Sequence, residues 1–137
     1  MNRSDLQSLS RERLNEARAL LDGGFASGAY YLAGYAAEFA LKACIAKQTA
    51  QYDFPDKDKA NASFRHDLER LSETANLSAK LVAYAKANTS FDANWKIAQA
   101  WNEKSRYRPV SDHEAKTLIE ALSNPKDGLL PWLELHW

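Results

Sequence analysis

Residues 25–47 constrain the fold most, because they have helical spacing and are apolar on nearly every side. One set of apolar residues repeats at alternating steps of four and three, the spacing of a packed helix: Phe25, Ala29, Leu32, Ala36, Phe39 and Ala43. A second set covers the other faces: Tyr30, Tyr31, Tyr35, Ala40, Leu41 and Ile45. A helix covered on one side only would be polar on the other. We therefore expect a central helix, either enclosed by the chain or forming part of a dimer interface.

Small side chains along this stretch would let a neighbouring helix approach closely. They are Gly28, Ala29, Ala33, Gly34, Ala36, Ala37 and Ala40. A bulky substitution such as Gly34→Leu is expected to disrupt that packing.

The rest of the chain predicts an all-α, up-and-down bundle of four to six helices in a single domain spanning residues 1–137. Helical patterns occupy residues 4–22, 66–75, 79–87 and 111–122, and a further segment carries Trp95, Ala98 and Trp101 and stops before Pro109. A capping box is expected at Ser4 and another at Ser111. Residues 51–63 lack a period and predict an exposed loop, and residues 129–137 predict a short docked helix. No strand alternation is present.

Charge and cysteine content narrow the function classes. Lys plus Arg and Asp plus Glu both total 18, so the chain has no net field to attract polyanions and any RNA contact must be local. The single cysteine, Cys44, excludes an intramolecular disulfide and is expected to be a small buried hydrophobe. The start of the sequence has no apolar leader, and no stretch reaches the ~20 apolar residues of a membrane span. A cytoplasmic protein that contacts no membrane is expected.

Four local patterns, taken in order, resemble the HEPN family of small prokaryotic helical proteins. They are residues 29–38 (AYYLAGYAAE) with 41–43, residues 66–68 (HDL) with Leu71, residues 105–109 (SRYRP), and residues 111–122. The resemblance implies a helical bundle that forms a homodimer, with a cleft lined by the Arg106–Tyr107 region. Several members are metal-independent ribonucleases, or toxins paired with nucleotidyltransferase-like antitoxins. It implies no cofactor.

The ribonuclease branch of that family carries an arginine followed four to six residues later by a histidine, and both Arg106 and Arg108 have this spacing to His113. Cleavage of RNA needs a base on the ribose 2′-hydroxyl and a cation on the phosphate. His113 in a first helical turn would be held neutral, and an arginine could bind the phosphate. The sequence departs from the branch in placing Tyr107 or Pro109 after the arginine and no tyrosine two residues beyond His113.

Each candidate also has a structural explanation. His113 fits a solvated first-turn residue, and the two arginines fit pairing with Asp112, Glu114 or a dimer partner. Glu38 and Lys42, expected near the cleft, have the spacing of an intrahelical ion pair, and their apolar surroundings also allow an interhelical role.

Other aromatic and titratable residues favour structural roles. The tryptophans at 95, 101, 132 and 137 fit the core better than base stacking. His66 fits a cap or surface position, and the three histidines are too dispersed for a local metal motif.

Two hypotheses follow. The first is a homodimeric domain associated with RNA or a nucleotide, including the case of a metal-independent ribonuclease toxin that uses Arg106 or Arg108 with His113. The second is a noncatalytic helical module that binds a nucleotide or a partner protein such as a nucleotidyltransferase.

Overall fold

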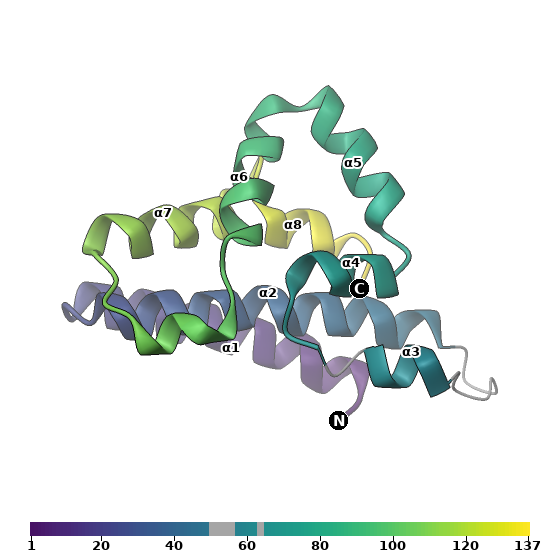
Figure 1. Ribbon diagram of the computed structural model, residues 1–137, viewed down its shortest axis with the longest axis horizontal. Coiled ribbons are helices and arrows are strands. Elements are labelled where there is room, and N and C mark those ends of the chain that lie inside the picture. Colours follow the sequence, from purple (N-terminus) through teal and green to yellow (C-terminus); the bar gives the residue numbers. More distant parts are fainter. Residues whose placement is uncertain (50–56, 63–64) are drawn as a thin grey trace.

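The computed structural model describes residues 1–49, 57–62 and 65–137, and every regular element in them is helical (Figure 1). The elements are α1 (Arg3–Asp22), α2 (Ala26–Gln48), α3 (Lys57–Ala62), α4 (Leu68–Thr74), α5 (Ser78–Ala87), α6 (Thr89–Gln99), the 3₁₀ helix η1 (Glu103–Tyr107), α7 (Asp112–Ser123) and α8 (Leu129–Glu134). The predicted all-α class is confirmed. The described helices outnumber the four to six expected, because α3 and η1 were not expected as separate helices and the short helices expected at residues 66–75 and 129–137 are present as α4 and α8. None of the helices in the described ranges has both the length and the hydropathy to cross a membrane.

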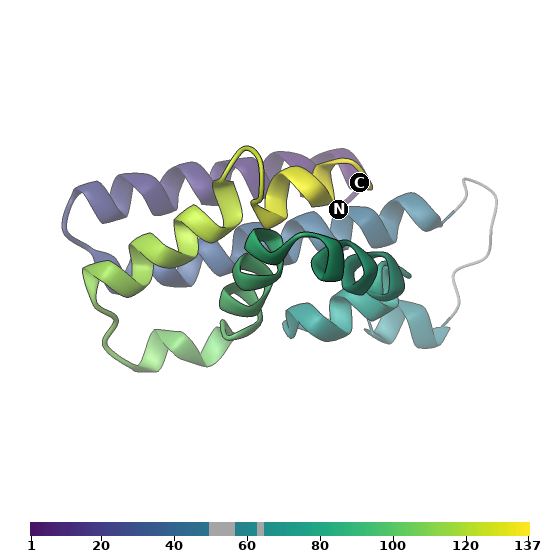
Figure 2. The same ribbon diagram turned by 90° about the horizontal axis from the view of Figure 1, so that it is seen from above.

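The centre of the bundle is α2. It runs antiparallel to α1 as a long hairpin, with α7 and α8 packed above it and α4 and η1 at its side (Figures 1 and 2). Helices α5 and α6 rise above this layer, where α6 contacts α7 and α8. Most faces of α2 are buried against these helices, whereas Tyr31, Leu32, Tyr35 and Phe39 are only half-buried. Enclosure within the chain is therefore confirmed for part of the helix, and the dimer interface stays a prediction.

Several predicted boundaries are confirmed by local backbone geometry. Helix α1 ends before Gly23, and Gly24 has φ +86°, a conformation that favours glycine. The break between α4 and α5 places Asn76 at φ 55°, which asparagine tolerates better than most residues. Ser111 caps α7 by accepting a hydrogen bond from the amide of Glu114.

Three predictions at helix ends were wrong. The capping box of α1 is formed by Asn2 and Asp5 rather than at Ser4, so the helix begins one residue before the predicted cap. The expected loop over residues 51–63 contains α3, since its Lys, Asp and Ala residues allow a helix without an apolar stripe. The remaining residues of that loop, 51–56 and 63, lie outside the described residues. Trp101 lies beyond α6, which ends at Gln99, instead of continuing its face.

The core is rich in aromatic and small residues, as the sequence indicates. Trp95, Trp101 and Trp132 are buried, and Trp137 is half-buried against the core. Cys44 is buried, and desolvation raises the pKa of its thiol to about 12. These residues fit the structural roles predicted for them.

Candidate functional site

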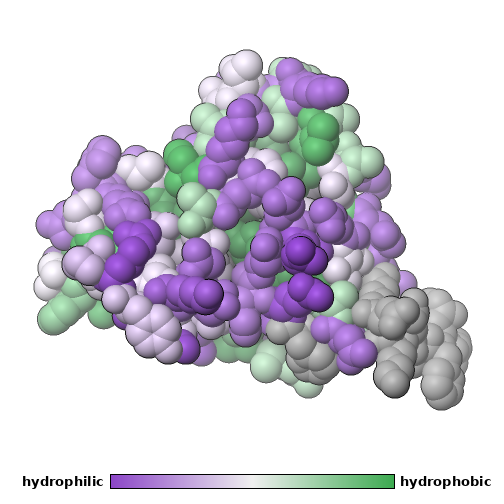
Figure 3. Space-filling model, in the orientation of Figure 1, coloured by the Kyte–Doolittle hydropathy of each residue, from purple (hydrophilic) through white to green (hydrophobic). Residues whose placement is uncertain are grey.

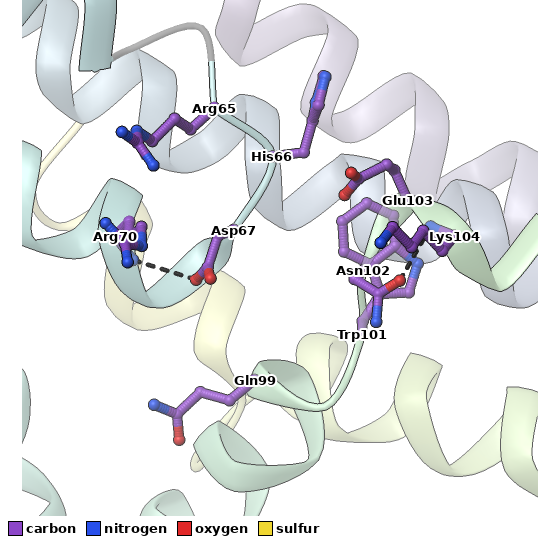
Figure 4. Close-up of a pocket in the computed structure, with 9 residues that line it drawn as sticks. All are labelled: Arg65, His66, Asp67, Arg70, Gln99, Trp101, Asn102, Glu103 and Lys104. Atoms are coloured by element: carbon purple, nitrogen blue, oxygen red, sulfur yellow. Dashed lines mark hydrogen bonds between the residues drawn. The ribbon is translucent and has the colours of Figure 1, made fainter.

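A pocket of about 520 Å³ opens between two segments that lie far apart in the sequence (Figure 4). One wall is the chain entering α4, with Arg65, Asp67 and Arg70. The opposite wall is the chain from the end of α6 into η1, and it contributes Trp101 and Lys104. Both segments pack on α2, which therefore brings them together. The face over η1 and α4 is predominantly hydrophilic (Figure 3).

The pocket carries a local excess of positive charge. Arg65, Arg70 and Lys104 are exposed, and none of them forms an ion pair with any residue that the structure describes. Asp67 caps α4, because its Oδ1 accepts from the amides of Glu69 and Arg70 at 3.0 and 3.2 Å. Two carboxylates line the pocket, Asp67 and Glu103, and Asp67 is thus engaged at a helix terminus. Although the whole chain has no net charge, this pocket is lined by three cations that have no ion-pair partner among the described residues, which suits an anionic ligand.

The amide side chains of Gln99 and Asn102 line the same pocket. Asn102 Oδ1 accepts from the amide of Lys104 at 2.9 Å and so caps η1. Beneath this segment, Trp101 Nε1 and Ser105 Oγ are buried and have no hydrogen-bond partner among the described residues.

At the rim of the pocket, a buried carboxylate on α2 holds a histidine. Glu38 is 1% exposed, and its Oε1 lies 2.7 Å from His66 Nδ1 while its Oε2 accepts from Lys42 Nζ at 3.2 Å. The predicted pair between Glu38 and Lys42 is confirmed. Of the two positions predicted for His66, the cap is wrong, because Asp67 caps α4, whereas the surface position is confirmed, since the His66 side chain is 42% exposed while it contacts Glu38. A buried carboxylate needs such partners to offset its desolvation.

Tyr35 connects the pocket to the next part of α2. Its ring packs edge-on against Trp101 at 5.3 Å and against His66 at 6.1 Å, measured between centroids. Its hydroxyl lies 3.3 Å from that of Tyr31. Burial raises the pKa of Tyr35, and the hydrogen bond with Tyr31 and the charge of Glu38 raise it further. The neutral phenol therefore persists at physiological pH.

Arg106 and Tyr107, at the end of η1, form a pair on the surface. Arg106 Nη2 donates to the Tyr107 hydroxyl at 2.7 Å, and the guanidinium carbon lies 4.7 Å from the centroid of the same ring. Hydrogen bonding to Tyr31 and then to Tyr107 raises the pKa of Arg106. Arg106 forms no ion pair within the described ranges, so its charge remains available for a ligand.

Arg108 points to different partners. Its guanidinium donates two hydrogen bonds to Glu114, at 2.7 and 3.1 Å, and lies 5.2 Å from the centroid of Tyr30. The hydrogen bonds from Arg108 lower the pKa of Glu114. In the predicted capping box of α7, the Ser111 hydroxyl accepts from the Glu114 amide as expected. The reciprocal bond of the box is replaced, because the Glu114 carboxylate binds Arg108. The predicted alternative, an arginine paired with Glu114, is what the structure shows for Arg108.

His113 lies exposed in the first turn of α7, after the Ser111 cap. No described residue hydrogen-bonds to it, and no hydrogen bond or ion pair within the described ranges joins it to either arginine. The sequence candidates therefore fall into separate groups. Arg106 and Tyr107 lie at the end of η1, the helix that contributes to the pocket. Arg108 precedes α7 and binds Glu114 in its first turn, which also contains His113.

Sequence reasoning missed the cationic residues of the pocket. Arg65 precedes the expected α4 helix and Lys104 follows α6, and neither stands in a motif. The only signal was the cluster of charged and amide residues flanking two predicted helix ends. No protein-family model, no curated protein and no solved structure significantly matches this chain. What the site binds must therefore be inferred from its own residues.

Proposed function

We propose that this chain is a HEPN-like, cytoplasmic helical domain that associates with RNA or a nucleotide through phosphate groups bound in the pocket. The observation that carries the proposal is the set of three cations around one cavity, Arg65, Arg70 and Lys104, none of which forms an ion pair with a described residue. Arginine can bind a phosphate with two parallel hydrogen bonds, and lysine adds a point charge.

The other pocket residues suit the remainder of a nucleotide. Gln99 and Asn102 offer amide groups of the kind that hydrogen-bond base edges. The volume of about 520 Å³ lies within the range of small-molecule sites. The zero net charge of the chain predicts modest affinity that depends on these local contacts.

Replacing Arg70 or Lys104 by alanine should weaken binding of a short labelled RNA by about tenfold, because each change removes a charge-assisted phosphate contact. Fluorescence anisotropy at about 50 and about 200 mM salt measures both the affinity and its salt slope, which should decrease in each variant. Lys126→Ala removes the same charge from the exposed turn between α7 and α8 and serves as the control. Equal losses in all three variants would contradict a local phosphate site.

The proposed assembly is a homodimer, with a nucleotidyltransferase-like antitoxin as a further partner. Most faces of α2 are buried within the chain, so its apolar character alone does not require a partner, and the dimer rests on the HEPN resemblance. Light scattering at micromolar concentration tests it directly. A monomer would remove the dimer from the proposal while leaving the pocket intact.

A second candidate function is a metal-independent ribonuclease toxin that uses an arginine with His113. Arg106 and His113 favour it, because both are exposed and neither is paired with a carboxylate among the described residues. Arg106→Ala and His113→Ala should each abolish cleavage of cellular RNA without added metal. Arg108→Ala should retain activity, because Arg108 binds Glu114. Absence of cleavage by the wild type would leave the noncatalytic binding module.

A further inference from the structure

Tyr107 is an aromatic side chain that the fold holds in solvent. It is 75% exposed, yet the ring is ordered from one side by Arg106, through the hydrogen bond to its hydroxyl and the stacked guanidinium. An exposed ring without such a contact would be free to rotate or to fold back on apolar neighbours. The pair therefore presents a flat surface to whatever approaches η1.

The geometry of η1 aligns this ring with the phosphate pocket. In a 3₁₀ helix the side chains of residues i and i+3 eclipse one another, so Lys104 and Tyr107 project from the same side. The rise per residue of a 3₁₀ helix separates them by about 6 Å along the axis. Lys104 lines the pocket. Tyr107, three residues further along η1, is outside the pocket lining. A ligand phosphate beside Lys104 would have its neighbouring nucleoside over η1.

We propose that Tyr107 is a base-stacking platform and that the ligand of this site is single-stranded RNA of two or more nucleotides. The proposal rests on the phosphate pocket proposed above and names its substrate class. One phosphate binds beside Lys104, with the base of the adjacent nucleotide stacked on Tyr107, and a neighbouring phosphate of the same strand binds at the opposite wall, which carries Arg65 and Arg70. Arg106, which has no carboxylate partner in the described part of the chain, supplies positive charge beside that base.

The alternatives fit these residues less well. In a duplex the faces of the bases are stacked on one another, so an aromatic side chain can reach them only in single strands, loops or ends. A mononucleotide in the pocket would leave Tyr107 unused. A cationic groove next to an aromatic platform is the common arrangement for single-stranded nucleic acid.

The test measures the affinity of the full chain for a short single-stranded RNA, the same sequence as a duplex, and a nucleoside monophosphate. Tyr107→Ala should weaken single-strand binding by about tenfold, whereas Tyr107→Phe keeps the stacking surface and should stay close to wild type. Binding of the monophosphate should be unchanged in both variants. Phe25→Ala removes another exposed aromatic, 65% exposed at the turn between α1 and α2, and should have no effect.

The outcomes separate this inference from the proposed function. If Arg70→Ala weakens RNA binding and Tyr107→Ala does not, the stacking platform is wrong and the phosphate pocket stands. Equal affinity for duplex and single strand would also overturn the inference. If the monophosphate binds and the single strand binds no better, the ligand is a nucleotide and the single-stranded RNA assignment is wrong. No binding of any of the three would overturn both.

Discussion

Gly34→Ala is expected to destabilise the protein by about 2–3 kcal/mol, an overpacking cost larger than most surface substitutions produce. A Cβ at position 34 would overlap the indole ring of Trp101, which lies directly on the backbone of α2. Trp101 is 2% exposed and also packs against Tyr35, so the ring has no space to withdraw. Urea unfolding followed by circular dichroism measures the loss. Gly34→Leu, the change suggested by the sequence, should be more severe.

Gly28→Ala is the matched control on the same helix. A Cβ there would meet only Leu20 Cδ1 at 3.4 Å, an ordinary contact, so the higher helix propensity of alanine should leave stability unchanged or raise it by about 0.5–1 kcal/mol. If both variants lose stability equally, general helix effects rather than the Trp101 contact would be responsible. Because Trp101 lines the pocket, Gly34→Ala should also weaken RNA binding, which Gly28→Ala should not.

The importance of α2 was predictable from local pattern, whereas its contacts were not. Apolar spacing over residues 25–47 placed the helix within one residue at each end, and small side chains singled out Gly34. The residue that fills the space, Trp101, lies in a connecting segment after α6, and nothing in local spacing links it to position 34. Periodicity reports which face of a helix is buried but not what covers that face.

In the candidate site, too, contacts between residues close in the sequence were predictable, whereas contacts between distant segments were not. The pair between Glu38 and Lys42 and the cap at Ser111 depend on residues three or four apart, which sequence patterns capture. The contact of Glu38 with His66 joins residues 28 apart, and the pocket joins two segments on either side of α5 and α6. Such sites depend on tertiary packing and leave no local motif. The roles of Arg106 and His113 stay predictions, since no hydrogen bond or ion pair in the described part of the chain joins them.

Glu38→Ala is expected to cost about 3 kcal/mol of folding free energy, near the lower end for breaking a buried ion pair. The carboxylate is buried, and its removal leaves Lys42 and His66 without their shared partner. Their side chains are 18% and 42% exposed, so each can recover some hydration, which keeps the loss from being larger. Glu38→Gln retains the size of the side chain and a hydrogen bond to His66, and should cost less.

Glu16→Ala is the control for Glu38→Ala, because it removes a carboxylate from a surface pair with Arg13 and should change stability by less than about 1 kcal/mol. Chemical unfolding of the three variants at neutral pH makes the comparison. Glu38 also fixes His66 at the rim of the pocket, so Glu38→Ala should weaken RNA binding under conditions in which the chain remains folded, whereas Glu38→Gln, which retains the hydrogen bond to His66, should bind RNA as the wild type does. If Glu38→Ala proves as mild as Glu16→Ala, the buried network contributes little to the fold. If Glu38→Gln binds RNA as weakly as Glu38→Ala does, the hydrogen bond to His66 is not what completes the site.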